Sequence, residues 1–360
     1  MEGVDCMGSI KLKQLSRIHV IFLTQSSMIG TGILSLPQKM SGMGYSQWFM
    51  PVVFGFSATL TLLPMIWLCS KFPKNNIFQM NEIILGKMIG KFISLLIIIQ
   101  FIISSTGIIS DYMHLIQSTA LPEQTITLPV ICFLLLVIYI VNSGILSISK
   151  FCIMTFFITV WLFPFLVWAF EKGEISHLLP LNNFTSKEFY EAFKGGFFSI
   201  LGYELILIYF PYIIDQKKAF FHSMIGIWIS ILLCLVTTFI CSIYYSEWQL
   251  KNIEYSVLNL FKAGEISFIE RLDIFGITLW VFHILTTVIV YIWSAQQGIV
   301  TLKKYKKNYL LYVIVIIVFC LIIIPSRDLQ EKLFLVSNYT GYLVIIWPVS
   351  LSLIYLLRKE

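Results

Sequence analysis

The chain has 360 residues, of which 58% are hydrophobic and only 12% are charged, and its formal net charge is +6. A soluble domain carries roughly 25% charged residues, so a water-soluble fold could not cover this much apolar surface. The composition therefore excludes a soluble enzyme and indicates an integral membrane protein, for which no cofactor is expected.

Apolar segments recur along the chain at lengths that suit membrane-spanning helices. Such a helix needs about 20 mostly apolar residues, whereas a membrane β-barrel would show alternating segments of about ten residues. We expect an all-α integral membrane protein with a single transmembrane domain over residues 1–360, in which residues 1–16 form a cytoplasmic N-terminus. The sequence predicts about ten spans, near residues 17–36, 46–70, 88–113, 126–145, 149–170, 192–213, 219–245, 273–299, 308–325 and 333–356.

Basic residues gather in alternate loops of this ten-span arrangement. Of the 25 lysines and arginines, 16 fall on the side that carries both termini, including the cluster Lys303–Lys307. The opposite side has two long, acid-rich loops. Because basic loops stay cytoplasmic, we expect both termini inside. The bias explains the net charge without a nucleic-acid partner, and the Lys303–Lys307 cluster is either a plain inside loop or a contact for anionic lipid in the bilayer.

The first span contains two glycines at a depth where a continuous helix would be more stable without them. Gly30 and Gly32 each cost about 1 kcal/mol relative to alanine in a helix interior. They lie on different faces of a helix, whereas close helix packing usually places small residues four apart. The spacing favours an unwound stretch with free backbone groups, which survive at membrane depth only where they line a cavity; close packing is the alternative.

The sixth span repeats this pattern around Gly195, Gly196 and Gly202, and adds an acidic residue, Glu204. Placing a carboxylate in the middle of a span costs about 2.5–3.5 kcal/mol. Intramembrane ionisable residues are functional by default, although a structural ion pair or a protonated, hydrogen-bonded carboxyl would also explain Glu204. The pattern predicts a second interrupted helix.

The two breaks fall in corresponding positions of two halves, near residues 17–170 and 192–356. Interrupted helices in this relationship are typical of an inverted-repeat transporter with a small-molecule site at their interface. Half-helix N-termini attract a carboxylate and free carbonyls attract an ammonium or a cation. We therefore predict a 5+5 inverted repeat, with spans 1 and 6 interrupted around an amino-acid-sized ligand.

Softer signals accompany the breaks, whereas catalytic or metal-binding patterns are lacking. Ser104, Ser105 and Thr106 interrupt span 3 and are candidates for lining the cavity, although such small residues also ease helix contact. Thr287 in span 8 is a second candidate, although threonine often bonds to its own helix. The sequence holds no nucleophile elbow, phosphate loop, paired metal motif or dinucleotide fingerprint.

The segment Ile29–Pro37, which follows a short basic N-terminus, resembles the first helix of amino-acid permeases of the APC superfamily, which have a LeuT-like fold. With Gly202-Tyr203-Glu204 in span 6, ten spans and a length near 360 residues, the chain is most similar to the B subunits of GerA-type spore germinant receptors (the GerB family). The resemblance runs from about residue 12 to the C-terminus. By position, it implies ligand contacts from Ile29, Gly30, Thr31, Gly32 and Ile33, and from Leu201, Gly202, Tyr203 and Glu204.

The resemblance also implies a location, partners and a function. Members of this family lie in the inner membrane of the dormant spore, act with an A subunit and a lipoprotein C subunit, and sense nutrients such as amino acids or nucleosides. Two other functions stay open: a proton- or sodium-coupled amino-acid transporter, and a water- or ion-conducting scaffold subunit with an empty site.

Overall fold

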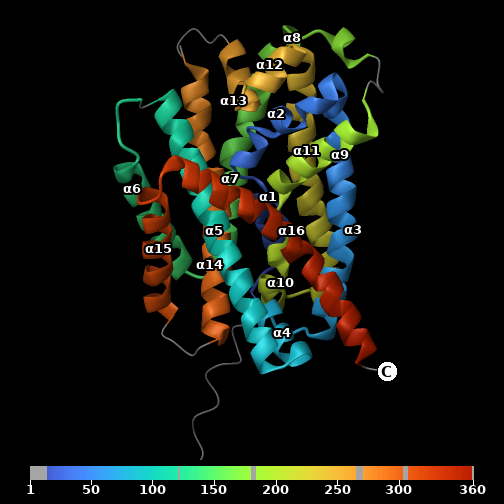
Figure 1. The fold of residues 1–360 in the computed structure, drawn as a ribbon, viewed down its shortest axis with the longest axis vertical. Coiled ribbons are helices and arrows are strands. Elements are labelled where there is room, and N and C mark those ends of the chain that lie inside the picture. Colours follow the sequence, from blue (N-terminus) through green and yellow to red (C-terminus); the bar gives the residue numbers. More distant parts are fainter. Residues whose placement is uncertain (1–13, 121, 180–183, 265–270, 303–306, 359–360) are drawn as a thin grey trace, which may run out of the picture.

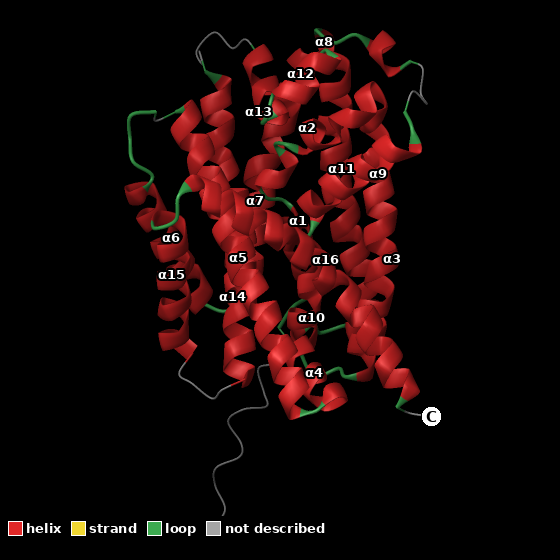
Figure 2. Cartoon of the chain, viewed as in Figure 1, coloured by secondary structure: helices red, strands yellow, loops and turns green. Residues whose placement is uncertain are grey.

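The computed structural model describes residues 14–120, 122–179, 184–264, 271–302 and 307–358, which form helices joined by turns (Figure 2). Residues 1–13 and the Lys303–Lys306 part of the basic cluster lie outside the described residues. The α-helices of the first half are α1 (Arg17–Met28), α2 (Leu36–Met40), α3 (Met50–Lys71), α4 (Ile77–Leu85), α5 (Lys87–Thr119), α6 (Thr127–Asn142), α7 (Ile145–Thr159) and α8 (Val167–Glu171). Those of the second half are α9 (Ser186–Phe197), α10 (Ile206–Tyr209), α11 (Ala219–Tyr244), α12 (Glu247–Asn252), α13 (Ser256–Leu260), α14 (Leu272–Leu302), α15 (Lys307–Ile323) and α16 (Arg327–Leu357).

Each predicted span coincides with one helix or with a broken set of helices. Within the described residues, six helical segments are long and apolar enough to cross a membrane, and the bent pair Ser186–Ile200 and Tyr203–Tyr212 is a seventh. The helices α6 and α15 are shorter but apolar, and α1 and α2 are the two halves of the first span. The protein is an all-α integral membrane protein, as the composition predicted.

The first span is interrupted where the glycines predicted a break. The α1 helix ends at Met28, and Ile29 (φ −93°, ψ 101°) and Gly30 (φ −123°, ψ −155°) are extended. A short 3₁₀ helix, η1 (Thr31–Ile33), then leads to α2. Helix α2 is followed by the 3₁₀ segment η2 (Ser41–Phe49), which is kinked at Gly44 (φ 57°, ψ −141°). Helix α3, which contains most of the second predicted span, begins directly after it.

The sixth span is interrupted in the same manner. After α9 and a 3₁₀ turn, η5 (Phe198–Ile200), Leu201 is extended (φ −67°, ψ 164°) and Gly202 adopts a positive φ of 127°. The chain then resumes as η6 (Tyr203–Leu205) and α10, and the two parts are bent by 47°. Both interruptions predicted from the glycines are therefore confirmed.

The interrupted helix α1 lies inside the bundle, where α7, α11 and α14 pack around it. Its residues from Leu23 to Met28 are all buried, and so are those of α14 from His283 to Gly298. At one edge of the bundle α6 and α15 lie side by side, and α16 crosses in front of α5 and α3 (Figure 1). The two breaks are therefore enclosed by complete helices and shielded from lipid.

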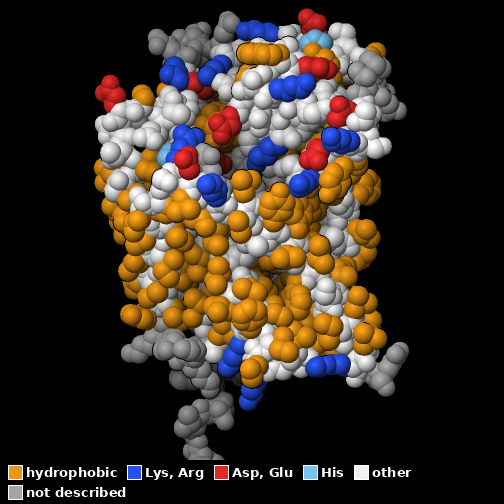
Figure 3. Space-filling view, viewed as in Figure 1, with side chains coloured by type: hydrophobic (Ala, Val, Ile, Leu, Met, Phe, Trp, Pro, Cys, Tyr) orange, Lys and Arg blue, Asp and Glu red, His pale blue; other side chains and the backbone are white. Residues whose placement is uncertain are grey.

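The outer surface divides into an apolar band and two charged ends (Figure 3). Large apolar side chains such as Phe56, Leu60 and Leu135 are more than half exposed on this band, where lipid replaces water as the solvent. The described chain ends lie together with α4: the Leu15 N–H donates to Tyr212 O at 2.9 Å, and Arg358 donates to Ile84 O. Helices α2, α8, α12 and α13 cover the opposite end (Figure 1).

Candidate functional site

The two breaks touch each other, and one of their close contacts joins Ser27 to the backbone of Gly202. The Ser27 hydroxyl donates to Gly202 O at 3.0 Å, and a Cβ added at Gly202 would lie 2.0 Å from Ser27 O. The positive φ of Gly202 is a conformation that residues with a side chain rarely adopt. Glycine is therefore required here both by the backbone conformation and by the close approach of α1.

Side chains of helix α14 donate hydrogen bonds to backbone carbonyl groups that lack helical partners at the first break. Trp280 Nε1 donates to Gly30 O at 3.3 Å. Thr287 Oγ1 lies 2.6 Å from Ile29 O, 2.9 Å from Ser26 O and 3.0 Å from its own-helix carbonyl, His283 O. Since a hydroxyl has one proton, Thr287 donates to one of these carbonyls at a time, and four oxygen atoms converge at this point.

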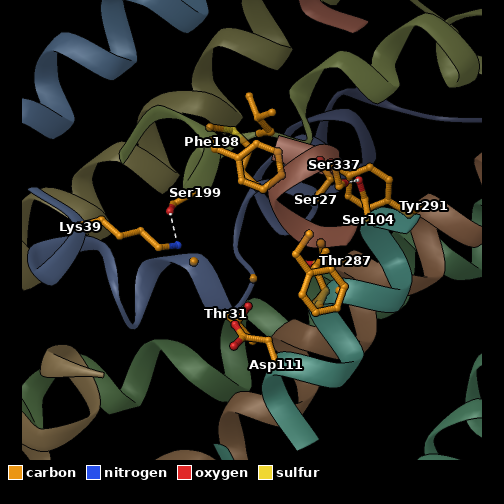
Figure 4. A pocket seen from close by; sticks show the side chains of 17 residues that line it. Ser27, Thr31, Lys39, Ser104, Asp111, Phe198, Ser199, Thr287, Tyr291 and Ser337 are labelled. Carbon is orange, nitrogen blue, oxygen red and sulfur yellow. Dashed lines mark hydrogen bonds between the residues drawn. The ribbon is translucent and has the colours of Figure 1, made fainter. Parts of the chain in front are cut away.

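A cavity of about 230 Å³ lies where the breaks meet α5, α14 and α16 (Figure 4). Polar side chains from α1, α2, α5, α14 and α16 face it together with apolar side chains such as Phe198 and Phe334. It is lined by Ser27, Met28, Gly30, Thr31, Gly32, Lys39, Ser104, Gly107, Ile108, Asp111, Phe198, Ser199, Leu201, Thr287, Tyr291, Phe334 and Ser337. The volume suits a small molecule, and the lining combines polar groups with apolar walls, as ligand sites do.

Two charged side chains of opposite sign face this cavity from different helices, Lys39 of α2 and Asp111 of α5 (Figure 4). Lys39 Nζ donates to Ser199 Oγ at 3.2 Å, and Asp111 Oδ1 accepts from the Tyr255 hydroxyl at 3.0 Å. Burial and the nearby carboxylates of Asp111 and Glu254 raise the pKa of Tyr255, so its hydroxyl remains a donor. Within the described residues, neither Lys39 nor Asp111 has an oppositely charged partner within 4.0 Å.

Glu204 lies just beyond the cavity, where it is 4% exposed. Its Oε2 accepts the Gly202 N–H at 2.7 Å, and its Oε1 accepts the Tyr291 hydroxyl at 3.1 Å. Tyr291 lines the cavity on its other side. The carboxyl group is therefore held by hydrogen bonds that stabilise the second break, and a side chain of the cavity wall is one of its partners.

The structure brings about half of the predicted site residues to the cavity. Gly30, Thr31, Gly32, Leu201, Ser104 and Thr287 line it. The others lie behind the wall: Ile29 and Ile33 are buried in the core, Gly202 and Glu204 shape the break, and the Tyr203 hydroxyl bonds to Thr61 of α3 at 2.7 Å. Ser105 and Thr106 bond to Ile102 O of their own helix.

Gly32 combines the two alternatives considered for the glycines. It lies in the interruption, yet a Cβ at Gly32 would lie 2.8 Å from Ser199 Cβ, which indicates close packing of the two breaks. At Gly30 the same added atom meets nothing within 4 Å. Gly30 therefore borders open space, whereas Gly32 is a packing position.

Sequence reasoning missed the charged pair at the cavity. Neither Lys39 nor Asp111 is among the site residues that the sequence predicts. A basic residue just after an interrupted helix and an acidic residue inside another span were the available signals.

No group of three or more His, Cys, Asp or Glu residues suited to a metal ion occurs in the part of the chain that is described. His283 instead bonds to Thr159 Oγ1 at 2.7 Å, as a core histidine would. The oxygen atoms around Thr287 are of the kind that binds hard cations, because carbonyl and hydroxyl oxygens can replace the hydration shell of such ions.

A comparison with solved structures identifies the fold. The chain superimposes on MhsT, solved in complex with L-phenylalanine, with a TM-score of 0.68 over 92% of this chain and 88% of that one. Sequence identity is 14%, so the likeness concerns the fold alone. It confirms the predicted LeuT-like arrangement.

Comparisons of sequence identify the family. The chain is 25% identical to spore germination protein GerQB of Bacillus cereus, over 96% of this chain and 98% of that protein. It is 26% identical to spore germination protein B2 of Bacillus subtilis over 74% of each chain, and 22% identical to protein A2 of the same species over 96% and 97%. The family profile described as "Spore germination protein" matches residues 14–330. The chain therefore belongs to this spore germination protein family of membrane permeases.

Proposed function

We propose that the chain is the ligand-sensing subunit of a spore nutrient germinant receptor, and that it has no enzymatic activity. A small nutrient would bind in the cavity between spans 1 and 6 and shift the bundle between two packings. Such a switch requires that the ligand bind one packing more tightly than the other. The A and C subunits of the same receptor would read the change, in the inner membrane of the spore with both termini on the core side.

The observation that carries this proposal is the cavity with two opposite charges, Lys39 and Asp111, for which the described residues provide no ion-pair partner. An α-amino acid carries an ammonium and a carboxylate, and therefore complements Asp111 and Lys39, whereas a nucleoside carries neither charge at neutral pH. Gly30 leaves open space at the same place. These features favour an amino acid among the nutrients that the family resemblance allows.

The binding part of the proposal is tested with the purified full-length protein and L-alanine, L-valine, L-leucine and L-phenylalanine as probes. Hydrogen bonds to charged groups contribute about 1.5–3 kcal/mol, so Lys39→Gln or Asp111→Asn should weaken binding about 10- to 100-fold. Lys39→Gln should also remove the preference for each free amino acid over the corresponding amino-acid amide, because the amide lacks the carboxylate that Lys39 would bind. Lys251→Gln and Glu171→Gln, which alter exposed charges outside the cavity, are the matched controls.

The sensing part is tested in spores that carry Gly30→Leu, whose side chain would enter the open space. We expect loss of nutrient-triggered germination, or a changed nutrient preference, at normal protein levels. An unchanged response to every nutrient would contradict the site and favour the scaffold function. Ligand-dependent uptake into vesicles that contain this chain alone would instead identify a transporter.

One observation favours the sodium-coupled transporter as the second candidate. The oxygens of Thr287, Ser26, Ile29 and His283 converge beside the first break, where a bound cation would stabilise the interruption. In that case ligand affinity should rise with sodium but not with potassium or choline, and Thr287→Val should abolish the sodium dependence. Ligand binding that is the same in all three salts would exclude this candidate.

A further inference from the structure

A second cavity lies between α5, α15 and α16, on the lipid-facing side of the ligand cavity, where Ile99 and Ile317 are 43% and 41% exposed. Its volume is about 270 Å³. Its lining is almost entirely apolar and consists of Ile99, Ile102, Ile103, Thr106, Ile317, Leu321, Gln330, Leu333 and Phe334. Phe334 is the one described residue that lines both cavities, so its ring separates them.

The ring of Phe334 lies directly on the backbone of α5. A Cβ added at Gly107 would lie 2.7 Å from both Cδ1 and Cε1 of Phe334, a distance that a real Cβ does not tolerate. Gly107 is therefore the position that lets the ring close the gap between α5 and α16. The wall between the cavities is one side chain thick at this point.

Hydrogen bonds hold α5 and α16 together on both sides of this ring. Ser104 Oγ lies 3.2 Å from Ser337 Oγ, and the Ser110 hydroxyl donates to Gln330 Oε1 at 2.6 Å. The two helices are thus fixed relative to each other one turn before and one turn after Gly107. Removing the ring should open a passage between the cavities without separating the helices.

We propose that Phe334 is a specificity-determining residue that limits the size of the apolar side chain the ligand can carry. The inference rests on the proposed amino-acid ligand. Lys39 and Asp111 hold the charged groups of the ligand, and the side chain extends along the apolar wall formed by Ile108 and Phe334. A larger side chain needs the space that lies behind the ring.

The test compares binding of L-alanine, L-valine, L-leucine and L-phenylalanine by the purified full-length protein and by its Phe334→Ala variant. We expect the preference to shift toward the two larger amino acids by about tenfold relative to L-alanine, the size of effect that one or two methylene groups have in an apolar pocket. Leu333→Ala, which enlarges only the second cavity, is the control and should keep the wild-type order. Phe334→Leu retains most of the apolar contact, and it replaces Phe334→Ala as the test variant if Phe334→Ala does not fold.

The outcomes separate this inference from the proposed function. If the wild-type protein binds at least one probe, and Phe334→Ala and Phe334→Leu keep the wild-type order of preference, this inference is overturned. The proposed function is not affected by that result. An equal shift in Leu333→Ala would also overturn this inference, because the effect would then come from loosened packing. A wild-type protein that binds none of the four amino acids would overturn the proposed amino-acid ligand and this inference together.

Discussion

Replacement of Gly202 by alanine should destabilise the protein more than replacement of Gly30 or Gly86, where an added Cβ would meet nothing within 4 Å. Alanine at a φ of 127° costs on the order of 1–3 kcal/mol in backbone strain. The new Cβ would lie 2.0 Å from Ser27 O, so α1 must move and the Ser27–Gly202 hydrogen bond, about 1 kcal/mol, is lost. The sum is about 3 kcal/mol, which corresponds to a decrease of roughly 6 °C in melting temperature if each kcal/mol shifts it by ~2 °C.

Substitutions at two other glycines separate the backbone strain from the lost contact with Ser27 in the destabilisation of Gly202→Ala. Gly86 has a φ of 86° and a ψ of 166° with nothing within 4 Å of an added Cβ, so Gly86→Ala should cost only the backbone term, on the order of 1–3 kcal/mol. Gly30 has a negative φ and the same open surroundings, so Gly30→Ala should leave the melting temperature almost unchanged. The assay is thermal unfolding of the three purified variants in one detergent at one scan rate, because unfolding of such proteins is commonly irreversible.

The expected order of melting temperatures is wild type and Gly30→Ala highest, then Gly86→Ala, then Gly202→Ala. A Gly202→Ala protein that melts no lower than Gly86→Ala would refute the argument, since the contact with Ser27 would then add nothing. A large loss in Gly30→Ala would show that the first break tolerates no side chain even where the space is open.

Two further changes probe groups near the breaks and at the end of the bundle that carries α4. Glu204→Gln leaves one acceptor oxygen for two donors, Tyr291 and the Gly202 N–H, and should destabilise the protein by about 1–3 kcal/mol; unfolding at the wild-type temperature would contradict this hydrogen-bond pattern. Asn76→Ala removes the N-cap of α4, in which Asn76 Oδ1 accepts the Gln79 N–H at 3.1 Å, and should cost about 1 kcal/mol; an increased melting temperature would show that the cap is unimportant.

The fold was largely predictable because two strong physical signals are local in the sequence. Apolar runs of spanning length define most helices, and the cost of Gly30 and Gly202 in a helix interior marks both interruptions. The first span is less apolar than the others, because Thr24, Gln25, Ser26 and Ser27 lie within it. In the structure these residues are buried, and Thr24 Oγ1, for example, lies 2.8 Å from the Tyr209 hydroxyl of α10, so hydrogen bonds between helices replace apolar contacts.

The charged part of the candidate site could not be predicted, because it depends on tertiary packing. Lys39 and Asp111 are far apart in the sequence, and nothing in the local pattern of either predicts that α2 and α5 face one cavity. Helices α12 and α13 were also missed, because they are only six and five residues long and lie within an acid-rich loop. Yet Tyr255, between these helices, is the residue that donates to Asp111.

The contact between the two breaks has a mechanical consequence. The interrupted spans are joined at the breaks by Ser27 and Gly202, and again near the chain ends, where Leu15 pairs with Ile213. Two points of attachment prevent one span from turning without the other. If the proposed receptor function is correct, a force on either break would therefore reach the α4 end of the bundle through both spans together, and a partner subunit would sense it there as one displacement.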